Sequence, residues 1–266
     1  MPDDPAFRRV LAEAADVAGL LWERGWAECN AGNLSCDVTD LLPASGPDEW
    51  QTLPQPVPEL AGRRLLVTTA GSRMRDVAKA PGRWCVVLEF GPDGAGFRVA
   101  RPGGGGTRLQ PTSELPAHLA IHVALRRRGT THRAVVHAHP TELLAISHDR
   151  RLLDEARLNA LLWSLHPEEV VVLPDGVAVV PYALPGSAEQ GRAAGAAMER
   201  HDVALWEKHG AVAVGADPAG AFDLIDTVNK AAQLLLLCRS AGYDPEGLSA
   251  SELGQLRRAF PPQSAR

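Results

Sequence analysis

The stretch from residue 112 to residue 139 restricts the fold of this chain more than any other part of the sequence. The segment "PTSELPAHLAIHVALRRRG" predicts a helix, with Thr112 or Ser113 as N-cap, Pro116 in the first turn and Gly129 at the end. The next apolar segment, "RAVVHAH", has the pattern of a buried strand. A helix that leads directly into a buried strand is typical of an α/β domain.

Helix and strand patterns alternate along the rest of the chain without an internal repeat. Apolar spacing predicts helices over residues 5–25 and about 219–242, the second of which ends the ordered core. Strand patterns flank the Pro-Asp-Gly turn of "EFGPDGAGF", and "EEVVVLPDGVAVVPY" predicts a strand, a turn and a second strand. We therefore expect one α/β domain over residues 1–266, with loose tails at residues 1–5 and 261–266.

Two segments predict neither a helix nor a strand. Proline, acids and glycine dominate residues 41–60, which indicates an exposed excursion. The sequence "RPGGGGTRLQ", which begins at residue 101, is too rich in glycine to hold one conformation unaided.

Charge and cysteine content limit the partners and the compartment. A net charge of −5 and a pI near 6.0 provide no basic field for nucleic acid or for an anionic membrane. The longest apolar runs, such as "LLLLC", are far too short to span a membrane. The four cysteines have no C-x-x-C spacing, and the N-terminus has no long apolar signal region. We therefore expect a cytoplasmic protein whose partner is a small molecule or another protein.

Two histidines stand in the predicted strand "VVHAHP". Side chains of a strand alternate between its faces, so His137 and His139 project to the same side. Neighbouring imidazoles bind a divalent metal well, but an H-x-H pair is equally compatible with a polar strand end bonded to backbone and water. His209 is the best candidate for a third ligand, because two apolar strand pieces meet there and Gly210 lets the backbone turn. Three histidines would leave a fourth position open on zinc, which is typical of a catalytic site.

Glu114 lies in the first turn of the helix that leads into the histidine strand. A carboxylate at this place is favoured by the helix dipole alone. Beside a metal it would act as a proton acceptor, or as a fourth ligand displaced by substrate. His118 and His122 follow on the same helical face, and we expect them to pack or to hydrogen-bond near the site without binding the metal.

Three small-residue loops indicate an anion site: "NAGN" at residues 30–33, "TAGS" at residues 69–72 and "TS" at residues 112–113. Glycine exposes backbone N–H groups, and Asn, Ser and Thr add neutral donors, a combination suited to phosphate. Each loop alone is an ordinary turn. Together with an open metal position, the loops indicate a phosphorylated, oxygen-rich substrate.

A resemblance to a known family is carried by five segments in this order: "GWAECNAGNLS", "PTSELPAH", "VVHAHPTELLA", "VVVLPDGVAVVPY" and "LWEKHGAVAVG". They resemble the class II sugar-phosphate aldolases of the aldolase/adducin family, and among these the branch that acts on L-rhamnulose 1-phosphate. The likeness extends from about residue 18 to about residue 260. It implies a three-layer α/β domain with a central, largely antiparallel sheet flanked by helices. It also implies a homotetramer with active sites at the subunit contacts.

The resemblance implies a role for each residue that matches a family motif. His137, His139 and His209 fall on the zinc ligands, with one Zn²⁺ per subunit, and Glu114 falls on the catalytic acid/base. Glu168 falls where the rhamnulose-phosphate branch has a further carboxylate that handles protons at the aldehyde end.

Two parts of this correspondence leave an alternative open. Glu169 adjoins Glu168, so an alignment shifted by one residue would move the role to the neighbouring acid. The loop "TTAGSRMRDV" departs from the family's "GSGK"-like pattern, which leaves the identity of the sugar phosphate open. The residues that match the phosphate-binding segments are Asn30, Gly32, Asn33, Gly71, Ser72, Thr112 and Ser113.

The activity that the resemblance implies is the reversible cleavage of a ketose 1-phosphate, with L-rhamnulose 1-phosphate as the expected substrate. The products would be dihydroxyacetone phosphate and an aldehyde, L-lactaldehyde. A metal enzyme of this kind needs no Schiff-base lysine, and the only lysines are Lys79, Lys208 and Lys230.

Other activities share the same scaffold. Sugar-phosphate 4-epimerases use the same retro-aldol step, and dehydratases of methylthioribulose phosphate are related. An aldolase specialised for another ketose phosphate or for an unphosphorylated acceptor is a further alternative. A non-catalytic interaction domain like the adducin head is expected to lack the three histidines, which are all present here.

Overall fold

The computed structural model describes residues 4–43, 49–100 and 109–261 of the chain. Within these residues nine strands form one sheet. They are β1 (Asn33–Asp37), β2 (Gln51–Thr52), β3 (Arg64–Thr68), β4 (Cys85–Phe90), β5 (Gly96–Ala100), β6 (Ala134–Ala138), β7 (Val177–Val180), β8 (Val203–Trp206) and β9 (Gly210–Gly215). Their order across the sheet is β2-β5-β4-β3-β1-β6-β9-β8-β7. Every neighbouring pair is antiparallel except β7 and β8, so the expected largely antiparallel sheet is confirmed.

The helices vary from single turns to more than twenty residues. They are α1 (Pro5–Glu23), α2 (Met74–Val77), α3 (Pro81–Trp84), α4 (Leu115–Arg128), α5 (Thr141–Ile146), α6 (Glu155–Leu165), α7 (Pro167–Val172), α8 (Ala188–Ala197), α9 (Pro218–Ser240) and α10 (Ala250–Ala259). Short 3-10 turns are η1 (Thr39–Leu41), η2 (Pro58–Leu60) and η3 (Arg150–Leu152). None of the helices in the described ranges is both long and apolar enough to cross a membrane.

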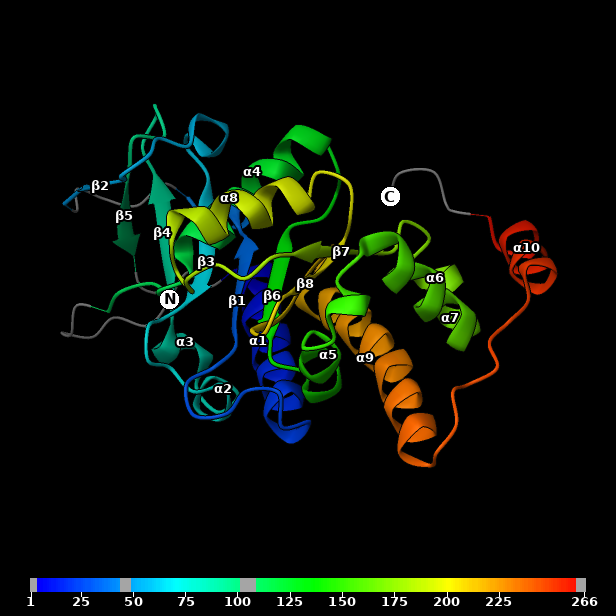
Figure 1. Ribbon diagram of the computed structural model, residues 1–266. Helices are drawn as coiled ribbons and strands as arrows, with labels where there is room; N and C mark the ends of the chain where they lie inside the picture. Colours follow the sequence, from blue (N-terminus) through cyan, green and yellow to red (C-terminus); the bar gives the residue numbers. More distant parts are fainter. Residues whose placement is uncertain (1–3, 44–48, 101–108, 262–266) are drawn as a thin grey trace.

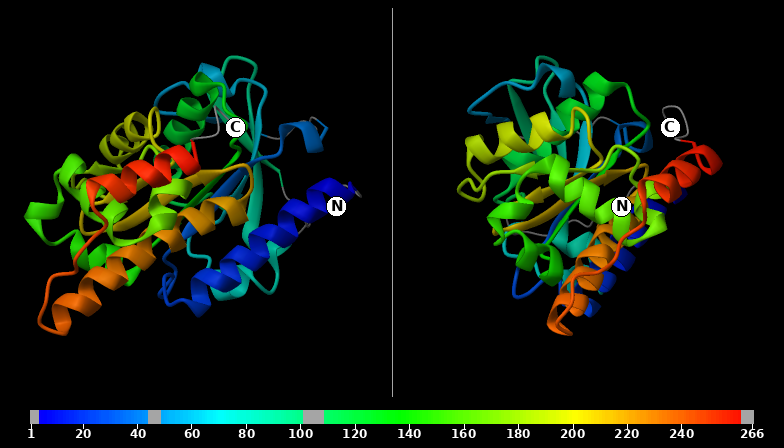
Figure 2. Two further views of the ribbon diagram at one scale, coloured as in Figure 1. Left: turned by 90° about the vertical axis from the view of Figure 1, so that its right-hand side faces the viewer. Right: turned by 45° about the vertical axis from the view of Figure 1, so that its right-hand side comes forward.

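Helices cover both faces of the sheet, which confirms the expected three layers (Figure 1). On one face, Ile121 of α4 and Val135 of β6 belong to the same buried cluster, and α8 lies beside α4. On the other face, Ile225 of α9 and Val136 of β6 share a second cluster, and α1 lies beside α9. Consecutive strand residues thus enter opposite layers, as the two-residue period of a strand requires. The same layers are visible from the side in Figure 2.

The strand register brings polar side chains together at one end of three neighbouring inner strands, on the face covered by α4. Asn33 of β1 is paired with His137 of β6. Ser35 lies two residues further along β1 and shares this face, whereas Leu34 packs into the cluster under α1 and α9. Strand β9 begins at Gly210, beside the end of β6. The start of β1, the end of β6 and the start of β9 therefore meet at one place.

The start of α4 differs from the sequence prediction. The first helical residue is Leu115 and the N-cap is Glu114, instead of Thr112 or Ser113. The N–H of Thr112 donates to a carbonyl at the end of β3 (2.9 Å), so the neighbouring strand holds this residue outside the first helical turn. The predicted glycine at the other end of α4 is confirmed by its left-handed φ of 66°.

The segment "EEVVV" is helical, and the strand predicted there is wrong. Pro167 occupies the first turn of α7, and Glu168 and Glu169 favour the start of a helix through its dipole. Packing of α7 against α6, α9 and α10 then outweighs the strand preference of three valines. The second strand predicted from this motif is confirmed as β7.

The described residues of the segment 41–60 are mostly exposed, as predicted, but two of its leucines are not. Leu53 and Leu60 are buried with apolar residues of β3, β4 and β5. The segment reaches this core because the short β2 pairs with β5. The glycine run that begins at residue 103 lies outside the described residues.

Both ends of the chain contain more regular structure than the sequence predicts. Asp4 accepts hydrogen bonds from the first turn of α1, so only residues 1–3 of the expected N-terminal tail lie outside the described residues. Beyond α9, which was expected to end the ordered core, α10 begins with a capping box formed by Ser249 and Glu252. The S-x-x-E spacing of this capping box is a signal that the sequence prediction missed.

Candidate metal and catalytic site

Three histidines converge where the start of β1, the end of β6 and the start of β9 meet. His137 and His139 come from the end of β6, and His209 comes from the turn between β8 and β9. Their ring centroids are 4.9–5.3 Å apart. One potential ligand atom of each lies within 4.8 Å of the other two. The structure therefore brings together the three residues that the sequence predicts as a set of metal ligands.

The turn that carries His209 is held in an unusual backbone conformation. Lys208 has a left-handed φ of 57°, and its N–H donates to the buried hydroxyl of Ser147 (2.9 Å). Two residues later, a Cβ on Gly210 would collide with the carbonyl oxygen of Ala138 and crowd the rings of His137 and His139. Glycine is required there because the turn passes directly over the end of β6.

The tautomer of His137 directs a lone pair into the cluster. Its Nδ1–H donates to the carbonyl of Ala211 (2.9 Å), which leaves Nε2 as an acceptor. Burial lowers the pKa of His137 to about 3, despite the opposing charge of Glu114, so the ring is neutral. Its buried Nε2 lies 3.4 Å from Glu114 Oε2 and has no hydrogen-bond partner among the described residues. Two acceptors that face each other at this distance fit a cation between or beside them.

The other two rings are held from behind. Nδ1 of His139 is 2.8 Å from Oε1 of Glu28, and Nδ1 of His209 is 3.1 Å from Nε2 of Gln190. Such partners fix the orientation of a metal-binding imidazole. Neither partner was identified in the sequence. Glu28 lies inside the motif "GWAECNAGN", whereas the contact of Gln190 depends on how α8 packs beside the turn.

Glu114 lies between these rings and a buried amide. Its Oε2 accepts a hydrogen bond from Asn33 Nδ2 (2.8 Å), and its Oε1 is 3.1 Å from His209 Nε2. Burial alone would raise the pKa of Glu114, but the hydrogen bonds from His209 and Asn33 hold it well below its usual value. The carboxylate is therefore ionised although it is only 6% exposed. An ionised carboxylate with so little contact with water suits a proton acceptor.

The loops predicted to bind phosphate are tied together beside this cluster. Ala70 N–H donates to the carbonyl of Gln110 (2.9 Å), and Leu34 N–H donates to the hydroxyl of Thr68 (3.1 Å). Gly32 has a φ of 76°, and a Cβ there would crowd Ala27. Of the predicted phosphate residues, Asn30, Gly71 and Ser113 are exposed, whereas Gly32, Asn33, Ser72 and Thr112 are buried. The side chain of Asn33 is engaged with Glu114.

Glu168 lies apart from the histidine cluster. Its side chain on α7 is 61% exposed and is 3.1 Å from His166 Nε2. The neighbouring acid, Glu169, is only 1% exposed, and burial raises its pKa to about 8. The structure thus places the two acids of this motif in opposite environments.

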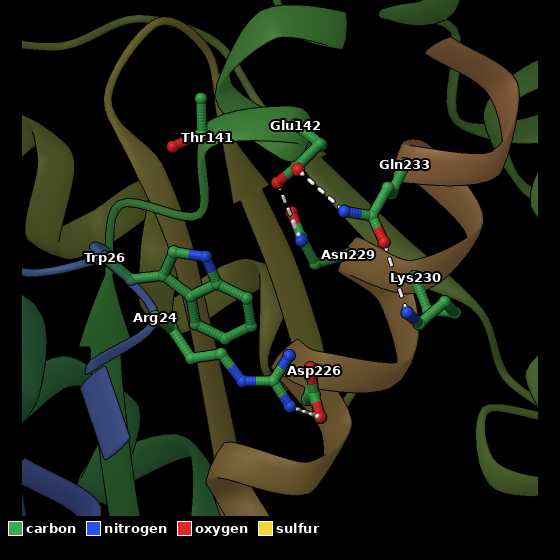
Figure 3. A pocket seen from close by; sticks show the side chains of 8 residues that line it. All are labelled: Arg24, Trp26, Thr141, Glu142, Asp226, Asn229, Lys230 and Gln233. Carbon is green, nitrogen blue, oxygen red and sulfur yellow. Dashed lines mark hydrogen bonds and ion pairs between the residues drawn. The ribbon is translucent and has the colours of Figure 1, made fainter. Parts of the chain in front are cut away.

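A separate pocket of about 130 Å³ lies near the start of α5 and along α9 (Figure 3). Several of its polar groups are paired with one another: Arg24 with Asp226 (2.8 Å), and Glu142 with Asn229 (2.9 Å) and Gln233 (3.1 Å). None of the predicted site residues lines this pocket. The histidine cluster, with its unpaired acceptor, is therefore the better candidate for a functional site.

The fold and the site define a known family. A family model described as "Class II Aldolase and Adducin N-terminal domain" matches residues 12–236. The chain belongs to this family, and it is an enzyme, a lyase of the class II aldolase type.

Curated relatives match nearly the whole chain. A rhamnulose-1-phosphate aldolase of Bacteroides thetaiotaomicron is 34% identical over 264 residues, which covers 96% of this chain and 96% of the relative. A rhamnulose-1-phosphate aldolase of Pectobacterium carotovorum is 37% identical over 251 residues, which covers 90% of this chain and 89% of the relative.

Solved structures share the fold. The crystal structure of a sugar-phosphate aldolase from Thermotoga maritima has a TM-score of 0.75 and 32% identity, and the match covers 90% of this chain and 99% of that one. An L-fuculose 1-phosphate aldolase has a TM-score of 0.62 at 20% identity, with 95% and 96% of the chains covered. At that identity the second match concerns the fold alone.

Proposed function

We propose that this protein is a zinc-dependent aldolase that reversibly cleaves L-rhamnulose 1-phosphate to dihydroxyacetone phosphate and L-lactaldehyde. The observation that carries the proposal is the convergence of three histidines on the buried, ionised Glu114. The substrate is supported by relatives named rhamnulose-1-phosphate aldolase at 34% and 37% identity.

His137, His139 and His209 would hold one Zn²⁺ per subunit. Neutral imidazole nitrogens are preferred zinc ligands, and the unpaired Nε2 of His137 opposite a carboxylate oxygen supports a cation at this place. Bound zinc supplies a Lewis acid that polarises the substrate ketone. The contacts behind the rings, with Ala211 and Glu28, keep the remaining ring nitrogens directed toward the site.

Glu114 would be the acid/base at the carbon that forms the new bond. In the synthetic direction it removes a proton from that carbon of dihydroxyacetone phosphate, and in the cleavage direction it returns a proton there. Its ionised state leaves it able to accept a proton, and its hydrogen bond from Asn33 holds one carboxylate oxygen in place.

The small-residue loops would bind the phosphate. Backbone N–H groups near Gly32 and Gly71, with the side chains of Ser72, Thr112 and Ser113, are neutral donors suited to this group. The hydrogen bonds that tie these loops to one another support a single phosphate site. Asn30 would complete it from the exposed end of its loop, and Asn33 would join it through its backbone.

Glu168 would serve the active site of a neighbouring subunit in a homotetramer. Its exposure on α7 supports a role outside its own subunit, where it would handle a proton at the aldehyde end. A Glu168→Gln variant should then slow cleavage but leave proton exchange of dihydroxyacetone phosphate unchanged. Unchanged cleavage would remove Glu168 from the mechanism.

We further propose a single-domain, cytoplasmic enzyme. One sheet contains strands from both halves of the chain, which supports a single domain over residues 1–266. All four cysteines are free, which fits a reducing compartment.

The decisive experiment is cleavage of L-rhamnulose 1-phosphate by the purified protein, before and after treatment with a chelator. Release of dihydroxyacetone phosphate, followed with a coupled dehydrogenase, should disappear with the chelator and return with Zn²⁺. L-Fuculose 1-phosphate is the matched comparison substrate. If the zinc-loaded protein releases no dihydroxyacetone phosphate, the proposal is wrong, and an epimeric or a dehydrated product would identify an epimerase or a dehydratase. No turnover of any sugar phosphate would favour a non-catalytic interaction domain.

A further inference from the structure

Five polar side chains form a continuous hydrogen-bonded chain behind the candidate site. Ser35 Oγ lies 2.7 Å from His118 Nδ1 and 2.8 Å from His122 Nε2. His118 Nε2 is 2.5 Å from Asn33 Oδ1, and Asn33 Nδ2 is 2.8 Å from Glu114 Oε2. All five side chains are buried, and none is more than 7% exposed.

The chain forms because two sequence periods meet across one interface. Asn33 and Ser35 are two residues apart and share the α4 face of β1. Glu114, His118 and His122 are four residues apart and share the face of α4 that lies against the sheet. Each strand residue therefore lies between two helix residues. Polar groups buried in this way require partners, and the two elements supply them to each other.

The order of donors and acceptors in this chain has one consistent solution. Asn33 Nδ2 donates to Glu114 Oε2, so the other end of the amide, Oδ1, faces His118, and an amide oxygen only accepts. His118 must then carry its proton on Nε2, and because burial lowers its pKa to about 3, it has no second proton on Nδ1. Ser35 donates to that Nδ1 and accepts from His122, whose Nε2 therefore carries a proton. Every hydrogen points toward Glu114.

We propose that His118, Ser35 and His122 are positioning residues that fix the orientation of the Asn33 amide and, through it, the Glu114 carboxylate. The two ends of an amide have nearly the same shape, so only its hydrogen-bond partners decide which end faces Glu114. Without the donor on His118, Asn33 Oδ1 has lost the partner that holds it, so the amide can rotate and the carboxylate oxygen that it binds is no longer fixed in place. The proposal rests on the proposed aldolase function only for its kinetic consequence.

The kinetic test compares two substitutions of His118 in the zinc-loaded protein. His118→Leu removes the donor to Asn33 and should lower kcat by about 10- to 100-fold, because small misplacements of a reacting group have effects of this size. KM should change little, since none of the three residues touches the substrate. His118→Gln keeps an N–H donor near the position of Nε2 and should restore most of kcat. Equal kcat for His118→Leu and the wild type would overturn the proposal.

A matched control separates positioning from a general loss of stability. His201 is also buried (7% exposed) but lies before β8, at the opposite end of that strand from His209. His201→Leu should lower the unfolding temperature as His118→Leu does, but leave kcat unchanged. If His118→Leu does not fold, Ser35→Ala is the smaller change and should also lower kcat. If His201→Leu loses as much kcat as His118→Leu and Ser35→Ala do, the effect comes from lost stability and not from positioning.

A second measurement needs no activity. Histidine-labelled wild-type protein, observed by ¹⁵N NMR, should show His118 and His122 as neutral rings protonated on Nε2. A ring of His118 protonated on Nδ1 or on both nitrogens would overturn the proposal whatever the protein catalyses. If the expected tautomers are found but L-rhamnulose 1-phosphate is not cleaved, the ordered chain of hydrogen bonds is supported and the proposed function is wrong.

Discussion

Two buried glutamates of this protein have opposite charge states, although burial acts on both in the same direction. Glu114 is 6% exposed and Glu169 is 1% exposed. Burial raises the pKa of Glu169 to about 8, and the adjacent acid adds to this rise, so the side chain is largely neutral at pH 7. Burial also acts to raise the pKa of Glu114, but the hydrogen bonds from His209 and Asn33 outweigh it and the carboxylate stays ionised.

The difference shows that hydrogen-bond donors, and not depth, decide the charge of a buried acid. Glu114 has a hydrogen bond from Asn33 and a histidine beside each oxygen. Oε1 of Glu169 has no hydrogen-bond partner among the described residues, and its helix packs against other helices. The ends of β1 and β6 therefore maintain an ionised carboxylate, whereas α7 maintains a neutral acid.

The largest expected effect is that of removing His137, the proposed metal ligand beside Glu114. His137→Ala should lower the rate of cleavage by about 10³-fold or more, because a Lewis acid contributes several kcal/mol to the transition state. Bound zinc should fall in the same sample. Bound metal and release of dihydroxyacetone phosphate measure the two effects. A metal-free variant with full activity would contradict the role of zinc.

The second prediction exchanges each glutamate for its neutral isostere. Glu114→Gln should keep the metal but slow exchange of the C–H proton of dihydroxyacetone phosphate with solvent by about 10²- to 10⁴-fold, the usual contribution of a general base. Glu169→Gln is the matched control and should leave exchange unchanged. Exchange that continues at the wild-type rate in Glu114→Gln would show that another group is the base.

The third prediction concerns stability against pH. Between the unfolded pKa of Glu169, near 4.5, and its folded pKa of about 8, the folded protein holds a proton that the unfolded chain releases. This group therefore destabilises the fold as pH rises through that window, by up to about 1.4 kcal/mol per pH unit. Glu169→Gln should remove this slope and leave stability near pH 4.5 almost unchanged. Urea unfolding at several pH values measures the slope.

The control for this prediction is the adjacent acid. Glu168→Gln should change the pH slope less than Glu169→Gln does, because its side chain is 61% exposed and its charge is the smaller cause of the raised pKa of Glu169. If the slopes of wild type and Glu169→Gln are identical, Glu169 is ionised in the folded protein and the contrast with Glu114 is lost.

The smallest expected effect is at the edge of the cluster. Glu28→Ala removes the carboxylate behind His139 and should weaken zinc binding by about tenfold, as is usual for a partner of a metal-binding histidine. Glu28→Gln keeps an acceptor and should lose less. Asp226→Asn, in the separate pocket, is the control. Competition with a chromophoric chelator measures the affinity, and equal affinities for all of these proteins would exclude a role for Glu28.

Local patterns predicted much of this protein correctly. The H-x-H strand is β6, the Pro-Asp-Gly turn joins β4 and β5, and helix α9 lies where the apolar spacing indicates. Each of these depends on neighbours within a few residues. The strand predicted at "EEVVV" was wrong because helix-end effects and packing outweighed the preference of single residues.

In the candidate site, too, some features follow from local sequence and others from packing. The sequence by itself determined that His137 and His139 project to the same side, because strand alternation is a local property, and it identified His209 and Glu114 as candidates beside them. Their charge states, the partners Glu28 and Gln190, and the chain of hydrogen bonds through Ser35 were decided by the tertiary structure. These depend on burial and on contacts between segments up to 111 residues apart, which no local pattern contains.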